Sequence, residues 1–110
     1  MFSRELKKGS IELLILSLLE SRPRHGYEIG KLIESRSDGQ LTFRIHSLYP
    51  TLCRMEDNAL IRSRWVEKKG ERRRRFYRLT PKGGRVLDEQ KENWKQYAAA
   101  INRVIGVDHA

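Results

Sequence analysis

Apolar residues recur at helical spacing in three successive segments of the N-terminal half of the chain. Residues 10–20 carry them at i, i+3, i+4, i+7 and i+8 from Ile11, which predicts a helix with a wide apolar face. Pro23 prevents this helix from continuing. Shorter helices are predicted at 26–35 and 45–58, because their apolar positions follow the same period. Their apolar sides consist of Tyr27, Ile29 or Gly30, Leu32 and Ile33 in the earlier helix, and of Leu48, Leu52, Met55 and Ala59 in the later one.

The pattern changes from residue 60 onwards. Residues 60–67 and 74–79 are rich in strand-forming side chains and flank the sequence Lys68-Lys69-Gly70-Glu71, so they predict a β-hairpin. Thr80 and Pro81 then mark a helix start, with threonine as the N-cap and proline in the first turn. The final helix is expected to end near residue 105. This order predicts a mainly α fold with a small β-hairpin, that is, a winged helix-turn-helix followed by a long helix.

Apolar residues also follow one side of the final helix in a seven-residue repeat. They are Leu87, Trp94, Tyr97, Ala98, Ile101, Val104 and Ile105. The rest of so short a chain cannot cover a helix of about 25 residues, which favours a dimer interface over packing within one subunit. Because the first predicted helix has a wide apolar face, we expect Leu14 and Leu18 to meet the second subunit as well.

The charge distribution points to a polyanionic partner. The 110-residue chain has a net charge of +9, and residues 62–85 contain eleven basic residues against two acidic ones. Nucleic acid is the commonest such partner, and an anionic membrane is the second. The basic residues lie on the predicted hairpin, whereas membrane surfaces favour a basic amphipathic helix. No apolar run is long enough to span a bilayer and Cys53 has no partner for a disulfide, so we expect a cytoplasmic protein.

The third predicted helix and the hairpin supply the candidate DNA contacts. With Leu48, Leu52 and Met55 inward, the helix turns polar or small side chains outward, and Tyr49 lies on the flank. The expected contacts on this helix are His46, Ser47, Tyr49, Pro50 and Arg54. The first residues of such a helix reach base edges in the major groove, whereas tyrosine and arginine also bind phosphates. The hairpin is expected to bind phosphates through Lys68, Lys69, Arg72, Arg73 and Arg74.

Three stretches together resemble the PadR family of transcriptional regulators. They are "HGYEI" at 25–29, "LYPTLCRMEDNALI" at 48–61 and "RRRRFYRLTPKG" at 72–83. The resemblance implies a homodimeric repressor that binds a two-fold operator, with residues 1–80 as the DNA-binding domain and 81–110 as the dimerisation helix and tail. It also implies that Tyr49 binds the DNA backbone and that Tyr27 is mainly structural.

The single helix after the hairpin resembles a compact subgroup of that family. Some members of this subgroup bind flat aromatic compounds between their subunits, which makes Trp94 a candidate ligand residue. Tryptophan at this repeat position is more often part of a dimer core. The alternative function is therefore a small-molecule or multidrug sensor with secondary DNA binding, and a third is a basic architectural or RNA-binding protein.

Other chemistry has weaker support in the sequence. Cys53 is expected on the DNA-facing side, where oxidation would disturb binding, although a lone helical cysteine is more often inert. His25, His46 and His109 do not fall at metal-ligand spacing, so no metal or other cofactor is expected. The sequence has no nucleophile–base arrangement and no glycine-rich phosphate loop, so an enzyme is not expected.

Overall fold

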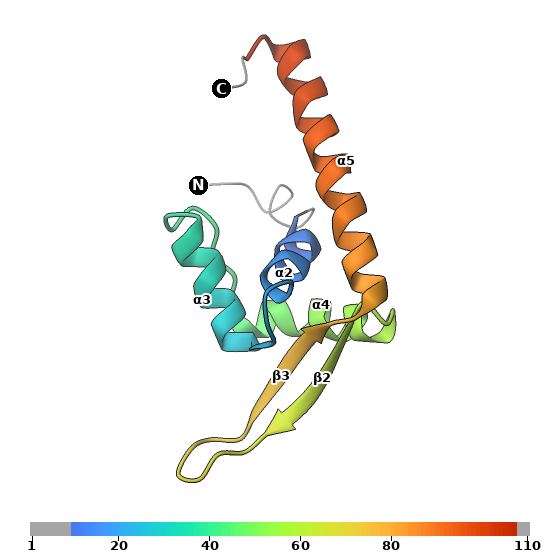
Figure 1. Cartoon of the computed structure of the whole chain (residues 1–110). Helices are drawn as coiled ribbons and strands as arrows, with labels where there is room; N and C mark the ends of the chain where they lie inside the picture. The colour runs from blue at the N-terminus through green and yellow to red at the C-terminus, as the bar shows by residue number, and fades with distance from the viewer. Residues whose placement is uncertain (1–9, 108–110) are drawn as a thin grey trace.

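The computed structural model of the chain describes residues 10–107, which form four helices and three strands (Figure 1). In chain order these are α2 (Ile11–Leu19), β1 (Arg24–His25), α3 (Gly26–Arg36), α4 (Ile45–Asp57), β2 (Ile61–Val66), β3 (Arg74–Leu79) and α5 (Pro81–Ile105). The predicted winged helix-turn-helix with a long final helix is confirmed. Helices α3 and α4 form the helix-turn-helix, and residues 61–79, here called the wing, form the hairpin (Figure 1).

The sheet contains a third strand that the sequence did not predict. Strand β1 pairs antiparallel with β3, with Arg24 opposite Tyr77 and His25 opposite Phe76, so the strand order is β1-β3-β2. Two residues between helices are too few to produce an alternating pattern. The consequence is that the start of α3 is joined directly to the wing.

The hydrophobic core lies between α2, α3, α4 and the first turns of α5. Its residues are Ile11, Ile15, Leu16, Leu18, Leu19, Ile29, Ile33, Leu48, Leu52, Met55, Leu60, Ile61, Tyr77 and Leu87. Leu18 and Leu87, which were predicted at the dimer interface, are both buried within one subunit. Helix α2 packs on both α3 and α5, so most of its wide apolar face is covered within the subunit.

Two residues assigned to apolar helix faces lie elsewhere. Tyr27 is 59% exposed, so it does not join the apolar side of α3. Ala59 follows the end of α4, where it is exposed and has a left-handed backbone with φ of 60°. The amide of Leu60 donates to the carbonyl of Met55 around this turn. Ala59 thus reverses the chain into β2.

Helix α5 starts at a tight junction with the core and extends far beyond it (Figure 1). The Oγ1 of Thr80 accepts from the amide of Gly83 at 2.9 Å, which confirms the predicted N-cap. A Cβ at Gly83 would lie 2.1 Å from the carbonyl oxygen of Leu60, so only glycine allows this approach. At 1.5 Å per residue the helix is about 37 Å long. Within residues 10–107, no helix combines the length and apolar character needed to cross a membrane.

Candidate nucleic-acid interface

Helix α4 presents the side chains that were predicted to face DNA. All of them are exposed: His46, Ser47, Tyr49, Pro50, Cys53 and Arg54. Leu48, Leu52 and Met55 are fully buried on the opposite side and fix this orientation. Pro50 is the sixth residue of the helix rather than part of its first turn, so the carbonyl of His46 lacks its usual intrahelical donor.

The four successive arginines of the wing have different surroundings. Arg73 lies over the ring of Trp65, Arg74 contacts the ring of His25, and Arg75 forms an ion pair with Glu56. Arg72 is exposed near the turn that Gly70 makes with φ of 80°. Lys68 and Lys69 are exposed at the same tip. The charge cluster is therefore partly ordered by specific contacts and partly open to solvent.

A depression of about 380 Å³ lies between the wing and the start of α4. Its lining is cationic and aromatic, and consists of His25, Gly26, Tyr27, Ile45, Tyr49, Trp65 and Arg72 to Arg75. The structure thus brings Tyr49 together with three predicted wing arginines, Arg72, Arg73 and Arg74. It also adds Tyr27 and Trp65, two exposed aromatics that the sequence did not assign to this surface. Arg54, Lys68 and Lys69 do not line this depression.

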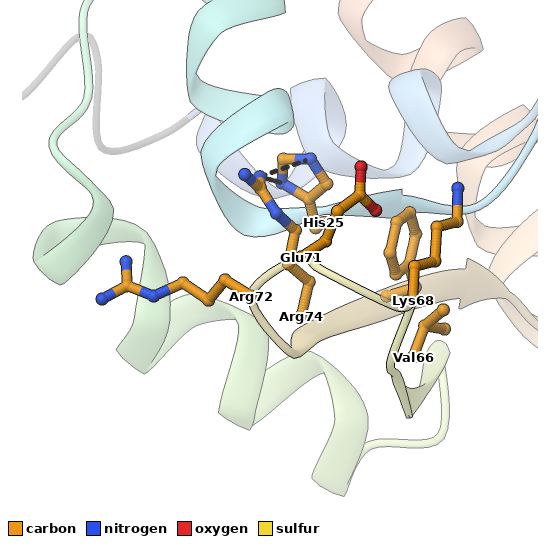
Figure 2. Close-up of a pocket in the computed structure, with 7 residues that line it drawn as sticks. His25, Val66, Lys68, Glu71, Arg72 and Arg74 are labelled. Carbon is orange, nitrogen blue, oxygen red and sulfur yellow. Dashed lines mark hydrogen bonds between the residues drawn. The ribbon is translucent and has the colours of Figure 1, made fainter.

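A neighbouring depression of about 390 Å³ lies on the other side of Arg74 (Figure 2). Its lining residues are His25, Val66, Lys68, Glu71, Arg72, Arg74 and Phe76. His25, Arg72 and Arg74 line both depressions, so they form the wall between them. Lys68 belongs to this second surface, together with the acidic Glu71.

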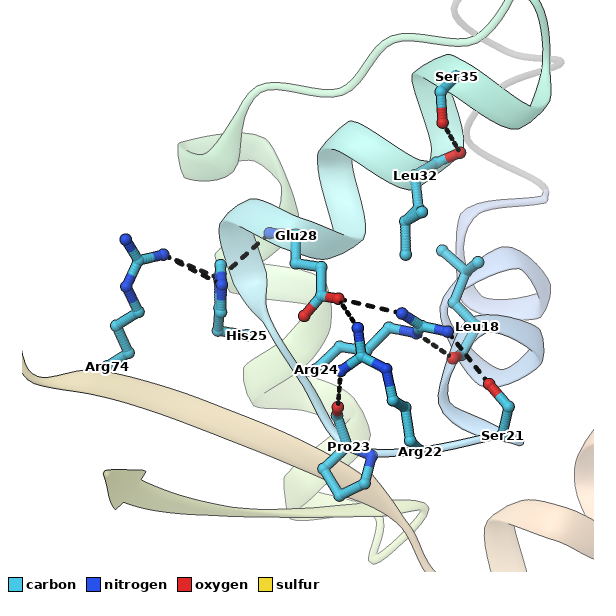
Figure 3. A network of polar contacts seen from close by, with 10 residues as sticks. All are labelled: Leu18, Ser21, Arg22, Pro23, Arg24, His25, Glu28, Leu32, Ser35 and Arg74. Atoms are coloured by element: carbon cyan, nitrogen blue, oxygen red, sulfur yellow. Dashed lines mark hydrogen bonds and ion pairs between the residues drawn. The ribbon is translucent and has the colours of Figure 1, made fainter. Parts of the chain in front are cut away.

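His25 connects the wing to the first turn of α3. Its Nδ1 accepts from the amide of Glu28 at 3.2 Å and so caps the helix. Arg74 Nη1 lies 3.0 Å from Nε2 of the same ring (Figures 2 and 3). Burial lowers the pKa of His25, and the nearby charge of Arg74 lowers it further. Both effects favour the neutral ring, which is the state in which Nδ1 can accept the amide hydrogen bond.

A buried arginine holds the turn between α2 and α3 (Figure 3). Arg24 is 6% exposed and donates to the carbonyl of Leu18, to Ser21 Oγ and to the carboxylate of Glu28. Burial alone would raise the pKa of Glu28, but hydrogen bonds and charges from Arg22 and Arg24 outweigh it and lower the pKa. This network fixes where α3 begins, and no residue pattern in the sequence announces it.

Most of the apolar side chains of α5 that were predicted at the dimer interface are exposed. Trp94 is 56% exposed, and Tyr97, Ile101, Val104 and Ile105 are exposed beyond it, while Ala98 is partly covered. Leu14 of α2 is also partly buried, packed against the core. Among residues 10–107, no group of three histidine, cysteine or acidic residues is placed to hold a metal ion. His109 lies outside the described residues.

Comparisons with known proteins agree with this geometry. Residues 15–89 match the model of the transcriptional regulator PadR-like family. A transcriptional regulator from Clostridium thermocellum is 32% identical, with a TM-score of 0.85 over 94% of this chain and 97% of its own. A PadR family transcription regulator from hypervirulent Clostridium difficile R20291 is also 32% identical, with a TM-score of 0.78 over 88% of this chain and 99% of its own.

One further structure shares the fold at lower identity. Bacillus subtilis PadR, solved in complex with operator DNA, is 22% identical, with a TM-score of 0.67 over 73% of this chain and 45% of its own. The family model covers more than half of the residues of this chain. The chain therefore belongs to the PadR-like family of transcriptional regulators, whose members are non-enzymatic DNA-binding proteins.

Proposed function

We propose that this regulator is a homodimeric repressor that binds a two-fold operator with one α4 helix in each major-groove half-site. The observation that carries the proposal is the shared surface of α4 and the wing, where Tyr49 meets Arg72 and Arg73. Exposed His46 and Ser47 near the start of α4 read base edges, while Arg54 and the wing cations hold phosphates. Such an action on promoters implies a cytoplasmic location.

The operator-bound Bacillus subtilis relative supports the DNA side of this proposal. The same fold there engages an operator, and here the net charge of the whole chain, +9, is carried by the wing and its flanks. Residues 1–80 act as the DNA-binding unit in this scheme. Residues 81–110 act as the dimerisation unit.

The dimer side rests on the exposed apolar residues of α5. Trp94, Tyr97, Ile101, Val104 and Ile105 lie along a part of the helix that its own core does not cover. A contiguous apolar strip of this kind is costly in water and is relieved by a second copy. The two α4 helices of the dimer must then lie about 34 Å apart to reach successive half-sites.

We further propose that a small planar aromatic compound relieves repression by stacking on Trp94. The indole is more than half exposed on the proposed interface, so it offers a flat apolar surface between two subunits. The alternative, a drug sensor in which DNA binding is secondary, uses the same residue. Saturable quenching of tryptophan emission, lost in Trp94→Phe but retained in Trp65→Phe, would locate the compound.

The proposal is tested with the promoter region of the protein's own gene. Affinity is measured for this DNA and for a scrambled sequence at two salt concentrations, and the free protein is sedimented. A dimer that prefers the promoter by about a thousandfold or more supports a specific repressor. Equal affinity for both DNAs, with a steep salt dependence, contradicts it and favours a basic architectural or RNA-binding protein.

A further inference from the structure

One carboxylate connects the recognition helix to both strands of the wing. Glu56 lies in the last turn of α4, and its Oε2 accepts from the Ser63 amide at 2.9 Å and from the Ser63 hydroxyl at 2.7 Å. Its Oε1 accepts from Arg75 Nη2 at 3.0 Å. Arg75 in turn donates from Nε to Ser63 Oγ at 2.8 Å, which closes the cluster. Ser63 is on β2 and Arg75 is on β3.

This cluster differs from an ordinary surface ion pair. An exposed pair contributes little, because two long side chains must be ordered in water for a weak attraction. Here the Glu56 and Arg75 side chains are only 29% and 37% exposed, and four hydrogen bonds fix their geometry. Arg75 also lies near the rings of Trp65 and Tyr77, and its guanidinium carbon is 5.8 Å from the centroid of each ring. Glu56, Ser63 and Arg75 therefore form a preordered connection between α4 and both strands of the wing, here called the joint.

The joint also changes the charge that the wing offers. Within residues 10–107, Arg75 is the only member of the four-arginine run with a carboxylate partner. The charge of Arg75 is paired with Glu56 of α4 and is therefore not available to a DNA phosphate. Arg74 lies against the ring of His25, and β1 pairs with β3, so the wing also contacts the start of α3.

We propose that Glu56, acting through Arg75 and Ser63, is a positioning residue that sets the wing relative to α4 and thereby sharpens sequence discrimination. This inference rests on the proposed function as an operator-binding protein. A fixed wing allows its phosphate contacts only when α4 sits in one register over the bases. A loosened wing holds phosphates in any register, and the released Arg75 adds one more phosphate contact.

The test compares Glu56→Gln with Glu71→Gln, which removes the same charge from the exposed wing tip but touches no joint. In Glu56→Gln, the ratio of operator to scrambled-DNA affinity falls at least tenfold, while affinity for scrambled DNA is unchanged or higher. The salt dependence of non-specific binding steepens by about one counterion per subunit. Glu71→Gln keeps the wild-type ratio.

A second variant breaks the same joint from its other end. Arg75→Gln lowers the affinity ratio as Glu56→Gln does, but it leaves the salt dependence at its wild-type value, because no cation is released. The double variant has an affinity ratio no lower than that of the more affected single variant, as expected for two residues of one joint. A fall in affinity for both DNAs by one common factor would instead indicate a merely structural role and overturn the proposal.

Hydrogen exchange separates the joint from the function that it serves. The Ser63 amide exchanges faster in Glu56→Ala, which removes both carboxylate oxygens, than in the wild type or in Glu71→Gln. Unchanged exchange at Ser63 overturns the joint, whatever the DNA result. If the wild type binds operator and scrambled DNA with equal affinity, the proposed function is overturned and this inference with it. A discriminating wild type whose affinity ratio survives in Glu56→Gln overturns this inference alone.

Discussion

Arg73 lies over the indole of Trp65, with its guanidinium carbon 4.4 Å from the ring centroid. Such a cation–π contact orders the arginine while leaving its N–H donors free to bind an anion. The guanidinium and the ring both line the depression beside Tyr49. The wing therefore presents at least one cation that is already oriented before DNA arrives.

Arg73→Ala is expected to weaken binding to every DNA sequence by a similar factor. The lost contact is to phosphate, so the salt dependence should flatten by about one counterion per subunit while the specificity ratio is kept. Anisotropy titrations of labelled DNA at several salt concentrations measure both quantities. Arg103→Ala, on α5, is the control and should leave the salt dependence unchanged; a sequence-dependent loss in Arg73→Ala would show that this arginine reads bases.

Ile101→Asp is expected to convert the dimer into a monomer and to abolish tight operator binding. A charge buried at an apolar seam loses hydration without gaining a partner. Gln96→Asp adds the same charge on the polar side of α5 and should remain dimeric. Sedimentation decides between these outcomes, and a dimeric Ile101→Asp protein would contradict the proposed interface.

Two adjacent glycines in α5 should respond in opposite directions to alanine. A Cβ at Gly83 would collide with the Leu60 carbonyl, whereas a Cβ at Gly84 would meet only Leu79, at 3.9 Å. Gly83→Ala is expected to lower the free energy of unfolding by about 1–3 kcal/mol or more. Gly84→Ala should raise it by about 0.5–1 kcal/mol through helix propensity. Urea unfolding of both variants tests the junction.

The lowered pKa of His25 predicts a pH-dependent stability. Below about pH 6.5 the unfolded chain takes up a proton at this residue more readily than the folded chain does. Stability should therefore fall as the pH decreases through this range, until the folded-state pKa is passed. His25→Asn keeps an N-cap acceptor but cannot titrate there, so its loss of stability between pH 7.5 and 5.5 should be smaller. Equal slopes in urea unfolding across these pH values would rule out the effect.

The sequence predicted the helices and the hairpin because their signals are local. Thr80 and Pro81 announce α5, and Pro23 ends the region of α2. The outward side of α4 was predictable for the same reason, since three buried side chains fix the helix orientation.

The missed features depend on contacts between residues far apart in the sequence. Arg75 looked like one more phosphate-binding arginine, and only the fold shows that Glu56 engages it. Leu18 and Leu87 fit an apolar repeat, but a repeat does not reveal which of its members the same subunit covers. Tyr27 fits the apolar period of α3 yet lies beside the wing, because β1 draws the start of α3 towards β3.

The short strand β1 also has a consequence for how the chain folds. Its partners Tyr77 and Phe76 lie about fifty residues further along, whereas β2 and β3 are joined by a short turn. Contacts that close long loops form slowly, because the chain loses conformational entropy before the new contacts stabilise it. The hairpin can therefore form early by itself, and the pairing of β1 with β3 should complete late, locking the helix-turn-helix to the wing in the final step of folding.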